Sequence, residues 1–374
     1  MSPDNRPSAD TFPPPVGGQP PQPRAIGRFA SFALGMSIIC VLAGGLTSFH
    51  VGYCSVGGAA VGLGWPLFVA FAVCVALTLG QVASAFPRAG GPCEWAAELG
   101  GRGWGWAAGC FNLAALVTVL TAINAGMCDF ALRSPARILA YDPDKLPTWV
   151  IPAAVVLVTV VQAAINHYGV RLTTRLTSFG GYLIVVTVFA LTGLLLACAL
   201  SSPAGLDPAR LVTFTNYSGP AGRDVWPATT SLGWLFALGL MMPAYAITGF
   251  EAPAQADEET ADPEVNVPRA MWQAVLLSGV AGWVMLSALV LAAPDPAVAS
   301  AAGKESFFQV IRSATPRWAH GPLYAAVVAS QFVCGLASLT AASRLAWAMA
   351  RDRGLPFARR LGRLGSHATP AAAI

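Results

Sequence analysis

Few side chains in this sequence could do chemistry, and they lie far apart along apolar segments. Glu251 directly follows Tyr245-Ala246-Ile247-Thr248-Gly249-Phe250, and an ionisable group within an apolar segment is a functional candidate because its burial is costly. Its carboxylate could accept backbone N–H bonds, carry a proton, or lie at the surface. Asp129 stands four residues before Arg133, which favours a surface ion pair. His167 ends an apolar segment and is expected to be an interface residue.

The sequence lacks the residue combinations of an enzyme or a metalloprotein. HExxH, GxSxG, a phosphate-binding loop and paired metal carboxylates are all absent. The eight cysteines include no CxxC pair, and most lie in apolar runs where a thiol acts as a small hydrophobe. The net charge of +4 is dispersed, without the basic, aromatic-interleaved stretch that nucleic acid requires. We therefore expect no enzyme activity, cofactor, metal site, disulfide framework or nucleic-acid partner.

The composition indicates an integral membrane protein. Hydrophobic residues make up 55% and charged residues 11% of the 374 residues, and the mean hydropathy is +0.59, whereas soluble domains have about 25% charged residues. Eight apolar segments are each long enough to cross a bilayer as a helix, so we expect one all-α transmembrane domain over residues 25–374. Residues 1–24, rich in Pro, Gly and polar residues, predict a disordered tail. The segments are 28–50, 64–86, 104–132, 149–168, 176–200, 229–250, 271–293 and 321–349.

The distribution of Lys and Arg predicts how the chain is oriented. With residues 1–24 in the cytoplasm, 14 of the 22 Lys and Arg fall on the cytoplasmic side and 8 on the other side. This asymmetry predicts a multi-pass protein of the cell membrane with a cytoplasmic N-terminus and the lipid bilayer as its surroundings. The apolar residues after Pro370 predict the start of a ninth span, and hence a sequence truncated at its C-terminus. The alternative is a true eight-span protein.

Two segments carry helix-interrupting residues in matching positions. The first contains Ala43-Gly44-Gly45-Leu46-Thr47 near its middle, and the sixth contains Pro243 followed by residues 245–250. A broken helix within a membrane exposes backbone N–H and C=O groups, and glycine lets a ligand approach the backbone. A carboxylate could therefore bind at the half-helix after the break without a buried Arg. The alternative is that Gly44 and Gly45 only permit close helix packing.

Four blocks of the sequence carry a family resemblance. They are SIICVLAGGLTSF (37–49), the long block that begins GWPLFVAFAVCVALTLGQ (64–113), YAITGFEAPAQADEETADPEVNVPRAM (245–271) and SRLAWAMARDRGLPFARRLGRLGSHATP (343–370). In this order and spacing, residues 25–374 resemble the amino acid-polyamine-organocation (APC) transporter superfamily, especially its GABA and choline permease-like branch.

The resemblance implies a five-plus-five inverted-repeat bundle in which helices one and six are unwound. The carboxylate of a substrate would meet the backbone near Gly44, and its amino group would meet carbonyls and side chains of the sixth helix. Phe250 or Tyr245 would act as a gate, and Glu251 matches the acidic position that follows the sixth-helix glycine of the family. The implied substrate-binding residues are Ala43, Gly44, Gly45, Tyr245, Ile247, Thr248 and Gly249, and the implied gating or coupling residues are Phe250 and Glu251.

The expected function is secondary transport of an amino acid or related amine by alternating access. Coupling is left open between proton symport and exchange with a counter-substrate, and Thr340 and Ser343 could contribute at most to a vestigial cation site. If the sequence is truncated, residues 1–374 alone should transport poorly. The alternative function is a non-transporting membrane scaffold or sensor with a transporter-like core. A membrane-embedded enzyme would require a nucleophile, base or metal-ligand set that the sequence does not supply.

Overall fold

The computed structural model describes residues 26–39, 41–87, 90–134, 145–167, 170–201, 205–222, 225–351 and 354–361. This part of the chain is helical apart from its connections and one isolated parallel bridge between Ile26 and Thr260. The predicted tail 1–24 and the predicted start of a ninth span after Pro370 lie outside it.

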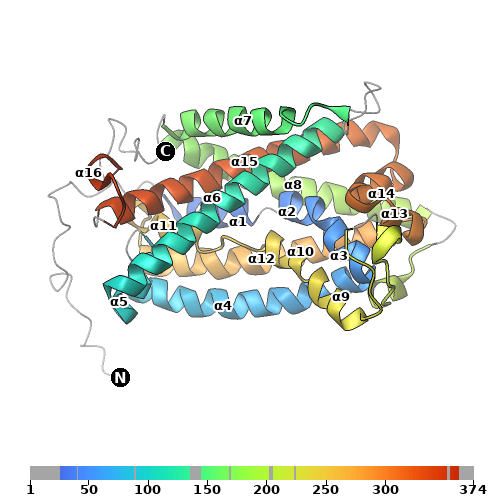
Figure 1. Cartoon of the computed structure of the whole chain (residues 1–374), viewed down its shortest axis with the longest axis horizontal. Coiled ribbons are helices and arrows are strands. Elements are labelled where there is room, and N and C mark those ends of the chain that lie inside the picture. Colours follow the sequence, from blue (N-terminus) through green and yellow to red (C-terminus); the bar gives the residue numbers. More distant parts are fainter. Residues whose placement is uncertain are drawn as a thin grey trace.

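The long helices lie side by side along one axis of the molecule (Figure 1). Seven of those described are long and apolar enough to span a membrane, and Leu232–Ala246 is a shorter apolar stretch. Together they account for the eight predicted segments and confirm an all-α membrane bundle. The first segment comprises α1 (Arg28–Ile38), α2 (Val41–Thr47) and α3 (Phe49–Val56), and the sixth comprises α9 (Leu232–Gly239) and α10 (Met241–Ala246). The other spans are α4 (Trp65–Ala85) with the preceding π-helical turn η2 (Ala60–Gly64), α6 (Arg102–Arg133), α7 (Val150–His167), α8 (Val170–Ser201), α12 (Pro263–Ala292) and α15 (Arg317–Arg351).

Short helices cover the two ends of the bundle (Figure 1). α5, α11 and α16 lie at one end, and α13 and α14 lie at the other, beside α3 and α9. At this second end the connection between α8 and α9 covers α3, because the indole of Trp226 donates to the Val51 carbonyl at 2.8 Å and Tyr217 N–H donates to the Ser55 carbonyl at 3.2 Å. The short helices are α5 (Pro92–Gly100), η4 (Pro208–Leu211), η5 (Gly219–Gly222), α11 (Ala252–Gln255), η6 (Asp257–Glu259), α13 (Pro296–Ala301), η7 (Gly303–Glu305), α14 (Ser306–Ala314) and α16 (Ala358–Leu361).

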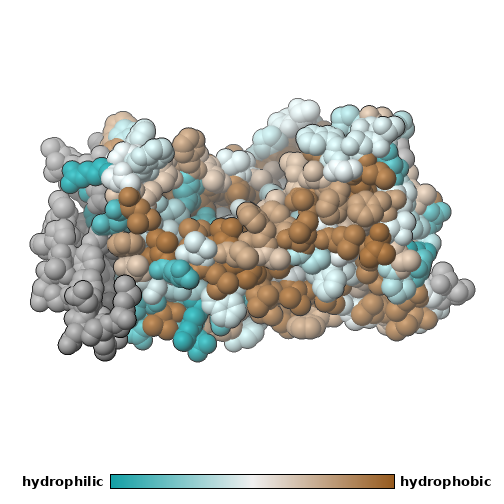
Figure 2. Space-filling view, turned by 90° about the horizontal axis from the view of Figure 1, so that it is seen from below, coloured by the Kyte–Doolittle hydropathy of each residue, from teal (hydrophilic) through white to brown (hydrophobic). Residues whose placement is uncertain are grey.

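The perimeter of the bundle is apolar along its middle. Phe71 of α4, Phe111 of α6 and Phe189 of α8 are 64%, 78% and 70% exposed. Figure 2 shows hydrophobic residues across the middle of one face, with hydrophilic residues toward its two ends. Soluble monomers rarely expose apolar patches of this extent, whereas a bilayer would cover such a band. The chain is therefore a multi-pass membrane protein.

The centre of the bundle is held by close packing of α12 against α2 and α4. A Cβ at Gly279 would lie 2.5 Å from Val69, and one at Gly282 would lie 2.5 Å from Val41 and 2.7 Å from the ring of Trp65. The indole of Trp65, which is fully buried, donates to the Gly279 carbonyl at 2.8 Å. Small residues allow membrane helices to approach closely, so these glycines fix α2 beside α12.

A buried polar cluster joins α6, α7 and α15. The Asn124 amide donates to Gln162 Oε1 at 2.8 Å, and the Gln162 amide donates to Asn124 Oδ1 at 3.1 Å and to the Phe332 carbonyl at 3.0 Å. Both amide side chains are fully buried. Gly335 of α15 lies directly against them, and a Cβ at this position would overlap Gln162 and Asn124. Glycine is therefore required here for α15 to reach the amide pair.

We expect Gly335→Ala to lower the free energy of unfolding by about 1–3 kcal/mol, because displaced buried amides would lose hydrogen bonds. The matched control is Gly321→Ala on the same helix, where an added Cβ would meet nothing within 4 Å. Alanine is the better helix former by about 1 kcal/mol, so this control should be neutral or stabilising. Thermal unfolding of the two purified variants tests the difference. Equal transition temperatures for Gly335→Ala and the parent protein would contradict it.

Candidate functional site

The sixth span loses its helical backbone where the sequence predicts it. α10 ends at Ala246, Ile247 adopts φ −106° and ψ 55°, and Gly249 has a φ of +79°, before α11 begins at Ala252. A positive φ is tolerated by glycine and disfavoured for other residues. Within the described part of the chain, the N–H groups of residues 248–250 have no hydrogen-bond acceptor. The sixth span is therefore interrupted between α10 and α11, and among the described residues this leaves main-chain donors without acceptors.

The first span is interrupted about one turn earlier than the sequence predicts. α1 ends at Ile38, Ile39 leaves helical geometry with φ −71° and ψ 39°, and α2 begins at Val41. Gly44 and Gly45 therefore lie inside α2, and the prediction of a break at this glycine pair is wrong. The physical reason is that Gly44 serves close helix packing, which was the alternative interpretation of the pair, because a Cβ there would lie 2.8 Å from the Cα of Ala246.

The two interrupted helices pack directly against each other. A Cβ at Gly44 would lie 2.8 Å from the Cα of Ala246, so α2 approaches the last turn of α10 at backbone distance. A Cβ at Gly249 would overlap Ile38, the last residue of α1. Glycine therefore stands at both crossings. The structure thus brings Gly44 next to Tyr245 and Ile247, the neighbours of Ala246 in the chain.

The other predicted binding residues occupy different sides of this contact. Ala43 is buried, and its carbonyl accepts a hydrogen bond from the Thr47 hydroxyl at 2.6 Å. Gly45 faces away from α10, since a Cβ there would meet Leu286 and Trp65 at 3.5 and 3.7 Å. Among the sixth-span residues, Ile247 and Gly249 are buried, whereas Tyr245, Thr248, Phe250 and Glu251 are half-buried.

Glu251 and Phe250 lie between the interruption and α11. Glu251 is the N-cap residue of α11, but its carboxylate makes no capping hydrogen bond to that helix. The suggestion that this side chain holds the broken helix by accepting N–H bonds is therefore not supported at α11. Phe250 packs between the main core and the small cluster that contains Trp95 and Met271.

α15 contributes two polar side chains near the end of α1, and the sequence analysis missed both. The Cys334 thiol donates to the Ile38 carbonyl at 3.3 Å, which satisfies one main-chain acceptor at the interruption. Gln331 lies one turn before Cys334 and is 1% exposed, yet neither its amide oxygen nor its amide nitrogen has a hydrogen-bond partner among the described residues. A buried polar group without a partner is costly. The signal in the sequence was a Gln in the middle of an apolar helix.

The remaining candidates are Asp129, Thr340, Ser343 and His167. Asp129 binds Arg133 at 2.9 Å, so the predicted ion pair is confirmed. The hydroxyls of Thr340 and Ser343 donate to carbonyls of their own helix at 2.8 and 3.0 Å. His167 is exposed at the end of α7. In the described residues no cluster of three or more His, Cys, Asp or Glu could hold a metal ion.

A buried ion pair fixes the segment that follows the broken sixth helix. Arg344 of α15 binds Glu259 of η6 through two hydrogen bonds of 2.8 and 2.9 Å, and both side chains are 5% exposed. The same segment is tied to the start of α1, because Ile26 N–H donates to the Glu259 carbonyl at 2.8 Å and Ala261 N–H donates to the Ile26 carbonyl at 2.9 Å. Neither Arg344 nor Glu259 was among the site residues expected from the sequence. The signal in the sequence was an Arg within the apolar segment 321–349.

Comparisons with known proteins agree with this architecture. A family model described as amino acid permease matches residues 26–374. The chain is 28% identical over 373 residues to Amino-acid permease BAT1 of Arabidopsis thaliana, which covers 94% of this chain and 69% of the relative. It is 26% identical over 354 residues to the GABA-specific permease of Saccharomyces cerevisiae, which covers 90% of this chain and 57% of that protein. The match and the helical bundle together confirm the predicted APC-type fold class.

Proposed function

Because the chain belongs to the amino acid permease family, we propose that it moves an amino acid or a related amine across the cell membrane by alternating access. Residues 25–374 form the transport domain in this proposal, with residues 1–24 on the cytoplasmic side. The yeast relative is named a GABA-specific permease, and the plant relative is named an amino-acid permease. Amino acids and GABA are therefore the first substrates to test.

The observation that carries this proposal is the contact between two interrupted helices in the core of a membrane bundle. Backbone groups that a continuous helix would satisfy are tolerated at membrane depth only where protein or a cavity surrounds them. The unpaired N–H groups of residues 248–250 and the unpaired amide of Gln331 are polar groups available to a small ligand. We propose that the substrate lies at this contact, among Ala43 to Gly45 and Tyr245 to Gly249.

Rearrangement at this contact would produce alternating access. Phe250 packs between two cores, so in this proposal its ring, with Tyr245, closes one side of the substrate. Glu251 would carry a proton, because it lies between α10 and α11 and its carboxylate does not cap α11. The alternative coupling is exchange with a counter-substrate.

The test is a two-stage measurement on the purified gene product. Thermal unfolding is first followed with amino acids, GABA, choline and polyamines, because a ligand that binds only the folded state raises the transition temperature. Uptake of each stabilising compound is then measured in proteoliposomes, with and without an imposed proton gradient. Accumulation that depends on the gradient would indicate proton symport, and accumulation only against an internal substrate would indicate exchange. The proposal would be contradicted if the folded protein showed no rise in transition temperature with any compound and its proteoliposomes took up none of them.

A further inference from the structure

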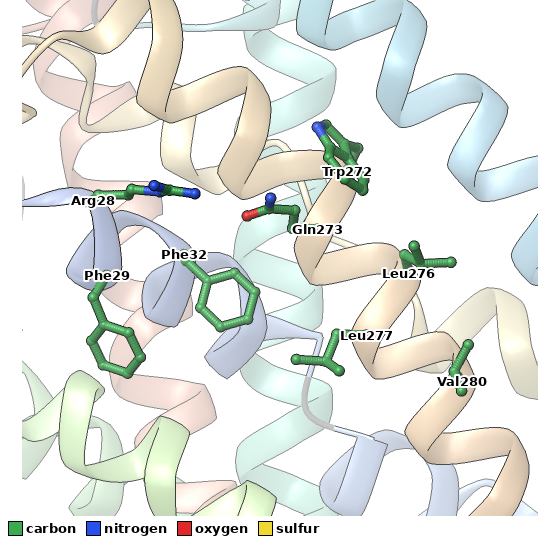
Figure 3. A pocket seen from close by; sticks show the side chains of 8 residues that line it. All are labelled: Arg28, Phe29, Phe32, Trp272, Gln273, Leu276, Leu277 and Val280. Carbon is green, nitrogen blue, oxygen red and sulfur yellow. The ribbon is translucent and has the colours of Figure 1, made fainter.

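A groove opens on the perimeter of the bundle between α1 and α12. Its volume is about 620 Å³, and the close-up shows its lining side chains on the facing sides of the two helices (Figure 3). The lining residues are Arg28, Phe29, Phe32, Trp272, Gln273, Leu276, Leu277 and Val280. Leu276, Leu277 and Val280 are 42%, 47% and 49% exposed. The groove is therefore an apolar surface that faces the membrane.

One end of this groove is positively charged. Arg28 begins α1 and is exposed, and its guanidinium points toward Gln273 across the groove (Figure 3). No carboxylate of the described residues lies within ion-pair distance of Arg28. Arg269 is also exposed and lies one turn before Trp272 and Gln273 on α12. The first turn of α1 contains no acidic residue and has no side-chain cap, so its N–H groups add to the positive potential.

The rest of the groove is apolar and runs along the two helices from this charged end. Phe32 lies one turn after Arg28 on α1, and Leu276 and Val280 follow Gln273 at one-turn intervals on α12. On the other side of α1, Phe29 stacks on Tyr182 of α8 with ring centroids 5.0 Å apart. α1, α8 and α12 all begin at the end of the bundle where Arg28 lies (Figure 1), so the groove runs from one membrane surface toward the bilayer interior.

We propose that this groove binds an anionic phospholipid of the leaflet in which α1 begins. The phosphate lies at Arg28 and the first turn of α1, within hydrogen-bonding reach of Gln273, and an acyl chain follows Phe32, Leu277 and Val280 inward. Basic pockets between transmembrane helices are known to hold anionic headgroups. A cationic amine would be repelled by Arg28, and a soluble anion would leave the apolar length of the groove uncovered. The lipid would join α1, one of the interrupted helices, to α12.

Trp272 lies within the groove and provides a reporter for the test. The protein is reconstituted in phosphatidylcholine vesicles that contain the same mole fraction of either dibrominated phosphatidylglycerol or dibrominated phosphatidylcholine. The bromine atoms quench tryptophan fluorescence on contact. The fluorescence quenching of the parent protein minus that of the Trp272→Phe variant gives the contribution of Trp272. We expect brominated phosphatidylglycerol to quench Trp272 more strongly than brominated phosphatidylcholine does. The ratio of the affinities of the two lipids for the groove is the preference, and Arg28→Gln should reduce it about fivefold, as expected for the loss of one basic side chain.

The control is Arg102→Gln, which removes an exposed Arg from the first turn of α6 outside the groove and should leave the preference unchanged. Equal quenching of Trp272 by the two brominated lipids in the parent protein would overturn the proposal, since it would show only general contact with the bilayer. An equal loss in the Arg28 and Arg102 variants would also overturn it, because the preference would then arise from net surface charge. The comparison of the two lipids in the parent protein requires no variant at Arg28.

Discussion

Replacing Gly44 with alanine should reduce substrate uptake about tenfold or more, and the same replacement at Gly45 should reduce it clearly less. The added methyl at Gly44 would lie 2.8 Å from the Cα of Ala246, which is backbone and cannot rotate away. α2 and α10 would have to separate at the proposed substrate site, and overpacking of this kind costs about 1–3 kcal/mol. At Gly45 the nearest atoms are side-chain carbons at 3.4 to 3.7 Å, which is close to ordinary contact.

The measurement is uptake in proteoliposomes that contain equal amounts of folded protein, with size-exclusion profiles to check folding. The two glycines are adjacent, in the same helix and both buried, so the pair controls for helix propensity and burial. Similar losses in both variants would indicate a general effect on α2. Unchanged uptake in Gly44→Ala would contradict a functional contact between the two interrupted helices.

Replacing Arg344 with alanine should lower the free energy of unfolding by about 3–5 kcal/mol, because it would leave the Glu259 carboxylate buried without its partner. Both groups are 5% exposed and joined by two short hydrogen bonds. The double variant Arg344→Leu and Glu259→Leu removes both charges, and it should recover much of the loss. Chemical or thermal unfolding in detergent measures the three proteins side by side.

The matched control for this pair is Asp129→Asn. Its partner Arg133 also lies on a helix, but Asp129 is 43% exposed, and exposed pairs contribute about 0–1 kcal/mol. We therefore expect a small change at most. A small change in Arg344→Ala as well would show that water reaches Glu259 and that the pair is not buried in the membrane-embedded protein. Failure of the double variant to recover stability would show that the segment needs this specific contact.

The membrane bundle could be predicted from the sequence because its signals are local. Each span is an apolar run of sufficient length, and hydropathy alone defines it. The interruption of the sixth span was also predictable, since Gly249 needs a positive φ that glycine tolerates. The interruption of the first span was predicted at the wrong residues because glycine occurs both at helix breaks and at close helix contacts. Gly44 allows close packing against Ala246, whereas the break falls at Ile39, a residue type that does not indicate a break.

The side chains that complete the candidate site could not be predicted, because their partners are far away in the chain. Glu259 and Arg344 are 85 positions apart, and each looks like an ordinary cytoplasmic charge until the fold buries both. Cys334 is read as a small hydrophobe from its neighbours, and only the packing of α15 on α1 brings its thiol to the Ile38 carbonyl. Pairing between residues so far apart in the chain depends on the tertiary structure and cannot be predicted from a single sequence.

The short bridge at Ile26 limits how the molecule can move. Two main-chain hydrogen bonds join the residue before α1 to the segment after α11, and the Glu259 side chain anchors that segment to α15. The first half of helix one and the last part of helix six therefore share one mechanical linkage at the same end of the bundle. Neither can swing outward without carrying the other or breaking the bridge. In the proposed alternating-access mechanism, the first and sixth helices would therefore move together when that end of the bundle opens.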